Sequence, residues 1–103
     1  EIFELAKKIA SKVNSFDMVE ACFLEIAKPS IPEGIKTCVS NKATEILIMP
    51  YFLAAGRHVL EDIPSIVDEE KVKYSDISIK SLPYFGSNPV IVDILNTLAE
   101  NDA

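Results

Sequence analysis

The sequence lacks the short motifs that mark the commonest nucleotide and hydrolase sites. It contains no G-x-G-x-x-G stretch, no Walker loop and no G-x-S-x-G stretch. It also has no cysteine and histidine arranged as a nucleophile and its base. These absences argue against dinucleotide and nucleoside-triphosphate chemistry.

Cysteine is scarce as well. The chain has only Cys22 and Cys38, which form no C-x-x-C pair and have no second pair to complete a zinc site. We expect free thiols that are buried or half-buried. Free thiols are typical of a reducing compartment, which predicts a cytoplasmic protein, or a plastid protein if the chain comes from a plant or an alga.

Long apolar runs and excess positive charge are also missing. The longest uncharged apolar run, Ile46 to Gly56, is too short to cross a bilayer and contains a proline. Ten basic residues stand against 16 acidic ones, a formal charge of −6, which repels nucleic acid and anionic membranes. Neither is an expected partner. A small anionic ligand remains compatible, because a few local cations outweigh a distant background that salt screens.

What the chain does have is a hydrophobic fraction of 49% over 103 residues, which suits one folded domain over residues 1–103. Its apolar spacing predicts helices and strands in alternation. Helices are expected over 2–13, from Ser30 onward, from near His58 onward and over 88–100; strands are expected over 18–24, 45–49 and 76–82. This order, αβαβαβα, predicts an α/β fold with a parallel sheet covered on both faces.

Helix boundaries are marked by specific residues. Ser30 followed three residues later by Glu33 predicts a capping box. Asn88 is expected to cap the last helix. The helix that begins near His58 is expected to break or bend at Pro64.

Two candidate functional residues follow neighbouring strands. Glu25 comes directly after the predicted strand over 18–24, and His58 lies just past the loop that follows 45–49. The carboxyl ends of parallel strands share one edge of the sheet, where such folds bind ligands. A carboxylate and an imidazole that meet there bind a divalent metal or transfer protons. The alternative is a helix cap and an ordinary surface charge.

Cations and aromatic residues are expected at the same edge of the sheet, which forms the rim of the predicted site. Arg57, beside a helix N-terminus, and Lys28 suit a carboxylate or phosphate, although either is also compatible with an exposed loop residue. The tripeptide Pro-Tyr-Phe occurs twice, so that Tyr51 and Phe52 end one strand as Tyr84 and Phe85 end another. These rings either belong to the core or wall an apolar slot for a flat ligand.

Two longer segments, "CFLEIAKPSI" and "PYFLAAGRHVLEDIP", resemble the small sirohydrochlorin chelatases of the CbiX/SirB type. The likeness runs from about Val19 to Leu98. It implies a class II chelatase fold, a doubly wound parallel sheet with a tetrapyrrole in the crevice at its carboxyl edge. It also implies the insertion of cobalt or ferrous iron into sirohydrochlorin, a step of cobalamin or siroheme biosynthesis.

The resemblance assigns roles to residues of this chain. It implies that Glu25 and His58 are the catalytic and metal-handling residues, and that Arg57 binds a substrate carboxylate. No cofactor is implied beyond the substrate metal, Co²⁺ or Fe²⁺, with Ni²⁺ as a further option. A homodimer is also implied. A non-catalytic module that binds a tetrapyrrole or a metal is the alternative, since the first histidine of the family is absent and many members have a further histidine where this chain has Asn88.

One family element is missing from the sequence. Family members begin with a strand that ends in His-Gly-Ser, and nothing before Glu1 supplies it. That strand is expected between 18–24 and 45–49, which without it would stand about 10 Å apart with unpaired backbone groups. We therefore expect three strands in this chain plus a missing first strand, and a domain that is incomplete at its N-terminus. Another chain in the gap, or a rearranged sheet, are the alternatives.

Overall fold

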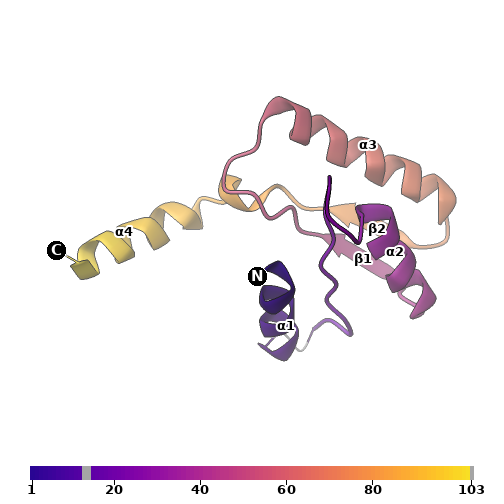
Figure 1. The fold of residues 1–103 in the computed structure, drawn as a ribbon, viewed down its shortest axis with the longest axis horizontal. Coiled ribbons are helices and arrows are strands. Elements are labelled where there is room, and N and C mark those ends of the chain that lie inside the picture. Colours follow the sequence, from indigo (N-terminus) through magenta and orange to yellow (C-terminus); the bar gives the residue numbers. More distant parts are fainter. Residues whose placement is uncertain (13–14, 103) are drawn as a thin grey trace.

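The computed structural model describes residues 1–12 and 15–102. Its elements in chain order are α1 (Ile2–Lys12), α2 (Ile31–Ser40), β1 (Glu45–Ile48), α3 (Arg57–Lys73), β2 (Ser78–Ser81), a short 3₁₀ turn (Phe85–Ser87) and α4 (Val90–Asp102). The predicted α/β class is confirmed (Figure 1).

The two strands form a parallel sheet that positions the rest of the domain. Glu45 lies opposite Ser78 and Ile48 lies opposite Ser81. Helix α3 connects the two strands, as a parallel pair requires. Side chains alternate between the faces of the sheet, so that Ile46 is buried while Leu47 next to it is 46% exposed.

The strand expected over 18–24 does not form, and the described residues make a sheet of two strands rather than three. The segment makes one isolated bridge, between Phe23 and Ser30, and the Phe23 amide donates to the Pro29 carbonyl at 2.8 Å. A strand needs a neighbour to pair with, and among the described residues no strand lies beside this segment. Packing holds it instead: Ala21 is buried, and Cys22 contacts the core.

The core lies between the sheet and the two helices α2 and α3. Its buried members are the aliphatic residues Ile31, Ile35, Ile46, Ile63, Val67 and Ile79. The predicted capping box of α2 is confirmed: Ser30 Oγ accepts from the Glu33 amide at 3.2 Å, and the Glu33 carboxylate accepts from the Ser30 amide at 2.9 Å. Helix α2 is therefore fixed at the end that faces the segment carrying Glu25.

Helix α3 runs without interruption through Pro64, so the break expected there is absent. Proline in a helix interior removes one hydrogen bond and costs about 3 kcal/mol. Ile63 and Val67 are buried in the core on either side of Pro64, and this packing keeps the helix continuous. As a result, one rigid element extends from Arg57 to Lys73.

Helices α1 and α4 bury none of their residues. Figure 1 shows α4 extending away from the body of the domain. The expectation that both faces of the sheet are covered is not met, because Leu47, on the face opposite the buried Ile46, is 46% exposed. The predicted cap of α4 is confirmed, because Asn88 Oδ1 accepts from the Val90 amide at 3.0 Å. The first helix is confirmed as far as Lys12, and Val13 lies outside the described residues. None of the helices in the described ranges is of a length and apolarity that would let it span a membrane.

Candidate metal centre

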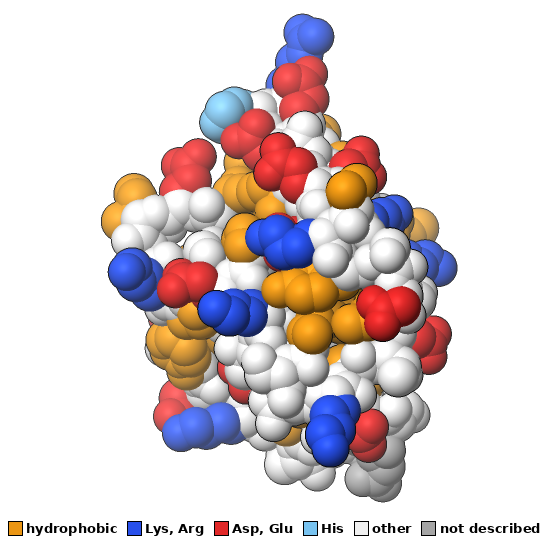
Figure 2. Space-filling model, turned by 90° about the vertical axis from the view of Figure 1, so that its right-hand side faces the viewer, with side chains coloured by type: hydrophobic (Ala, Val, Ile, Leu, Met, Phe, Trp, Pro, Cys, Tyr) orange, Lys and Arg blue, Asp and Glu red, His pale blue; other side chains and the backbone are white. Residues whose placement is uncertain are grey.

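The structure brings Glu25 and His58 together. His58 is the second residue of α3, and its Nε2 lies 3.6 Å from Glu25 Oε1. Both side chains are well exposed, His58 at 74% and Glu25 at 60%. In Figure 2 the histidine, in pale blue, stands at the surface beside acidic side chains. An imidazole nitrogen and a carboxylate oxygen at this distance can hold one divalent cation or pass a proton.

A third side chain, Asp62, completes the cluster. Its Oδ2 lies 3.0 Å from His58 Nε2, and one ligand atom from each of the three residues lies within 4.8 Å of the others. Asp62 follows His58 by one helical turn, the spacing that places two side chains on one face of a helix. The sequence reasoning missed this residue, although the spacing of four within a predicted helix was the signal for it.

A tight turn directs the chain away from the cluster immediately after Glu25. The Ala27 amide donates to the Glu25 carbonyl at 2.7 Å, which closes a turn around Ile26. Ile26 has a φ of 68° and a fully exposed side chain. A β-branched residue adopts this left-handed conformation only at a cost in free energy. Glu25 is therefore the last residue before this turn, with its side chain beside His58.

The two candidate cations lie near the cluster but outside it. The Arg57 side chain is 91% exposed, and its Nε donates to Glu61 Oε1 at 3.0 Å. Lys28 lies close to the start of α2. Hydrogen bonds from Ser30, and to a lesser extent the charges of Lys28 and Lys36, lower the pKa of the Glu33 carboxyl. Among the described residues Lys28 forms no ion pair, whereas an anionic ligand at Arg57 would compete with the Glu61 carboxylate.

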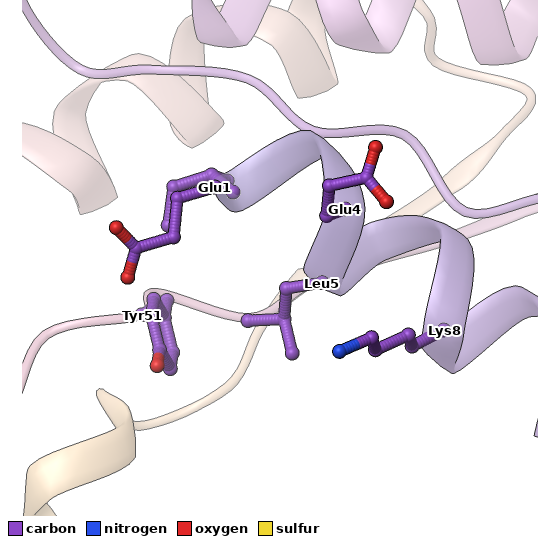
Figure 3. Close-up of a pocket in the computed structure, with 6 residues that line it drawn as sticks. Glu1, Glu4, Leu5, Lys8 and Tyr51 are labelled. Carbon is purple, nitrogen blue, oxygen red and sulfur yellow. The ribbon is translucent and has the colours of Figure 1, made fainter.

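The aromatic residues after β1 separate into two roles. Phe52 packs against the core, whereas Tyr51 is 52% exposed, with its ring centroid 5.6 Å from that of Phe85. Tyr51 lines a pocket of about 350 Å³ together with residues of the first helix, as Figure 3 shows. The residues contributed by the N-terminal segment are Glu1, Ile2, Glu4, Leu5 and Lys8. Phe52 therefore belongs to the core, as one of the two predicted alternatives has it, whereas the ring of Tyr51 remains exposed.

The cysteines take no part in the cluster. Cys22 and Cys38 are free and half-buried, as the sequence predicted. Burial raises the pKa of the Cys22 thiol, and the nearby Cys38 and Glu20 raise it further. Burial, followed by Glu20, raises the pKa of Cys38 as well. Both groups therefore remain protonated thiols at neutral pH, which are poor nucleophiles and poor metal ligands.

A sequence model of the CbiX family matches residues 1–101. The chain belongs to the CbiX family. Its fold is similar to that of a putative cobalamin (vitamin B12) biosynthesis CbiX protein from Marinobacter aquaeolei VT8, with a TM-score of 0.76 at 21% sequence identity, covering 97% of this chain and 82% of that one. The resemblance and the chelatase-like parallel α/β fold expected from the sequence are therefore confirmed.

Two relatives of the chain are sirohydrochlorin chelatases. The chain is 30% identical over 89 residues to a chloroplastic sirohydrochlorin ferrochelatase of Arabidopsis thaliana, covering 86% of this chain and 40% of the relative. It is 29% identical over 100 residues to a sirohydrochlorin cobaltochelatase of Priestia megaterium, covering 97% of this chain and 32% of the relative. The chain thus spans less than half the length of these two CbiX-family relatives.

Proposed function

We propose that this chain inserts Co²⁺ or Fe²⁺ into sirohydrochlorin, as a step of cobalamin or siroheme biosynthesis. The observation that carries the proposal is the 3.6 Å approach of His58 Nε2 and Glu25 Oε1 at one exposed rim. The names of the CbiX-family relatives, a ferrochelatase and a cobaltochelatase, support the substrate. No cofactor is proposed other than the metal that is inserted.

Metal insertion exchanges two protons for one cation. Two pyrrole nitrogens each lose a proton, and a divalent metal takes the place of both. The imidazole of His58 offers a nitrogen lone pair, which binds the incoming metal or accepts a proton. Glu25 balances the charge of the metal and serves as the second proton acceptor. The exposure of both side chains, 74% and 60%, lets a hydrated ion reach them and leave again.

The substrate presents many carboxylates to an acidic protein. Arg57 is proposed to pair with one of them, because a guanidinium binds a carboxylate through two parallel hydrogen bonds. Lys28 is proposed to act as a second, weaker contact on the same rim. Tyr51 offers an exposed ring to the flat macrocycle, and Phe52 supports the same loop from the core.

The direct test is to mix the chain with sirohydrochlorin and Co²⁺, Fe²⁺ or Ni²⁺ and follow the absorbance of the macrocycle. We expect insertion of cobalt or iron well above the rate without protein. Fastest insertion of nickel would instead assign that metal. Saturable binding of sirohydrochlorin without insertion of any metal would contradict the enzyme and favour a non-catalytic binding module, the alternative that Asn88 motivates.

We further propose that the protein is a homodimer. The apolar residues of α4 are exposed, with Val92 at 57%, Leu95 at 60% and Leu98 at 62%, and a second copy would bury them. The compartment we propose is the cytoplasm, or a plastid for a plant or algal chain, in line with the name of the chloroplastic relative.

The dimer predicts a specific response to mutation. Sedimentation should give twice the 11.4 kDa mass of one chain, and Leu95→Glu should return it to one chain, because a buried unpaired charge opposes association. Asn96→Glu adds the same charge to the neighbouring exposed position and should leave the mass unchanged. A wild-type protein that sediments as a monomer at micromolar concentrations would contradict this proposal.

A further inference from the structure

We propose that Asp62 is a third ligand of the divalent cation, so that the metal is held by Glu25, His58 and Asp62 together. The inference rests on the proposed function, since it adds a residue to the same site. It assigns to this chain a three-residue face that binds the metal before the macrocycle takes it.

The spacing of the ligand atoms fits one small cation. Divalent ions of this size bind nitrogen and oxygen at about 2.0–2.2 Å, so neighbouring ligands in octahedral or tetrahedral shells lie about 3.0–3.5 Å apart. His58 Nε2 lies 3.0 Å from Asp62 Oδ2 and 3.6 Å from Glu25 Oε1. The Asp62 separation lies within this range and the Glu25 separation lies just above it, so a small movement of the exposed Glu25 side chain would let both carboxylates share one ion with His58.

Charge also favours a cation at this position. Two carboxylates within 4.8 Å of each other repel unless a positive group lies between them. Among the described residues, neither carboxylate pairs with a lysine or an arginine, and the one side chain that each of them pairs with is His58. A divalent ion would balance the two negative charges and would accept the imidazole nitrogen as a third ligand.

The helix holds two of the three ligands rigidly. His58 and Asp62 are one turn apart on α3, and Ile63, the residue after Asp62, is buried in the core with 6% exposure. Asp62 is also the least exposed of the three side chains, at 36% against 74% for His58. It therefore lies deeper in the cluster, on an element that packing fixes.

A face of three ligands has a chemical consequence. It occupies one side of the coordination shell of the metal and leaves the other side to water or to pyrrole nitrogens, as in other sites with three ligands on one face. The macrocycle nitrogens would replace the waters first and the protein ligands afterwards. Three ligands also bind the free ion more tightly than two.

The test is the affinity of the full chain for Co²⁺ without sirohydrochlorin, measured by calorimetry and by the visible absorption of the bound ion. Asp62→Asn keeps the shape of the side chain and removes its charge. It should raise the Kd for Co²⁺ about 10- to 100-fold. The matched control is Glu61→Gln, which removes the same charge from the preceding residue of the same helix and should change the Kd less than about threefold.

Two further variants separate this inference from the proposed function. If His58→Ala and Glu25→Gln weaken Co²⁺ binding but Asp62→Asn does not, the third ligand is overturned and the two-residue site stands. If none of the three variants changes the Kd, the proposed metal site itself fails. Asp62→Glu retains a carboxylate and should recover part of the affinity, which a general loss of folding would not allow.

Discussion

Replacing His58 with alanine is expected to slow the insertion of cobalt or iron into sirohydrochlorin about 10²- to 10⁴-fold, the range for losing a positioned acid–base group. The imidazole is the one nitrogen ligand in the cluster, and both Glu25 and Asp62 lie within 3.6 Å of it. Its removal leaves two carboxylates with no group between them. Both the capture of the metal and the acceptance of a pyrrole proton should suffer.

The same variant should fold normally. The His58 side chain is 74% exposed, so its truncation removes little packing, and such surface changes alter the free energy of unfolding by less than about 0.5 kcal/mol. Ser65→Ala, at an exposed position of the same helix, serves as the control and should keep full activity. The measurement is the rate of change of the macrocycle spectrum at saturating Co²⁺. Unchanged turnover in His58→Ala would remove this residue from the mechanism.

Replacing Gly86 with alanine is expected to lower the free energy of unfolding by about 3 kcal/mol or more, an effect typical of forced overlap in a packed site. A Cβ atom at Gly86 would overlap the backbone carbonyl of Leu53. The backbones meet here because the Gly86 amide donates to the Phe52 carbonyl at 2.7 Å and the Phe85 amide donates to the Pro50 carbonyl at 2.9 Å. A side chain would force the two loops apart.

This change should also reduce metal insertion, because the loop after β1 leads directly to the start of α3 and to His58. Gly56→Ala is the matched control: nothing lies within 4 Å of a Cβ at that position, and its φ of −70° suits alanine. As an N-cap change it should cost about 1 kcal/mol at most. Urea unfolding of the two variants measures the difference. Equal stability of Gly86→Ala and Gly56→Ala would show that the two loops are not closely packed.

Local chemistry made much of the fold predictable. The capping box of Ser30 and Glu33 and the cap at Asn88 depend on residues close in sequence, and both formed as predicted. The strand over 18–24 failed because apolar composition shows that a segment is buried but not what pairs with its backbone. The continuity of α3 at Pro64 was likewise decided by tertiary packing, which outweighs a local preference for a break.

The candidate site, like the fold, could be predicted from the sequence only in part. The meeting of Glu25 and His58 was predicted from the rule that strand ends share one edge of an α/β fold, and it occurs although the segment before Glu25 forms no strand of the sheet. Asp62 required the helix phase as well, and the role of Gly86 required the contact between two loops that lie far apart in sequence. The two Pro-Tyr-Phe tripeptides mark the place of that contact in the sequence. The first begins with Pro50 and the second ends with Phe85, and the Phe85 amide donates to the Pro50 carbonyl.

The three residues of the cluster lie on two different kinds of element. His58 and Asp62 belong to helix α3, which packs against the core, whereas Glu25 precedes a sharply turned loop. An ion bound to all three residues would therefore have two ligands on a helix and one on a loop. Release of the ion should start at Glu25, because His58 and Asp62 are fixed on a helix that packs against the core. This difference predicts an order for the transfer of the metal to the macrocycle, in which the bond to Glu25 breaks before the bonds to His58 and Asp62.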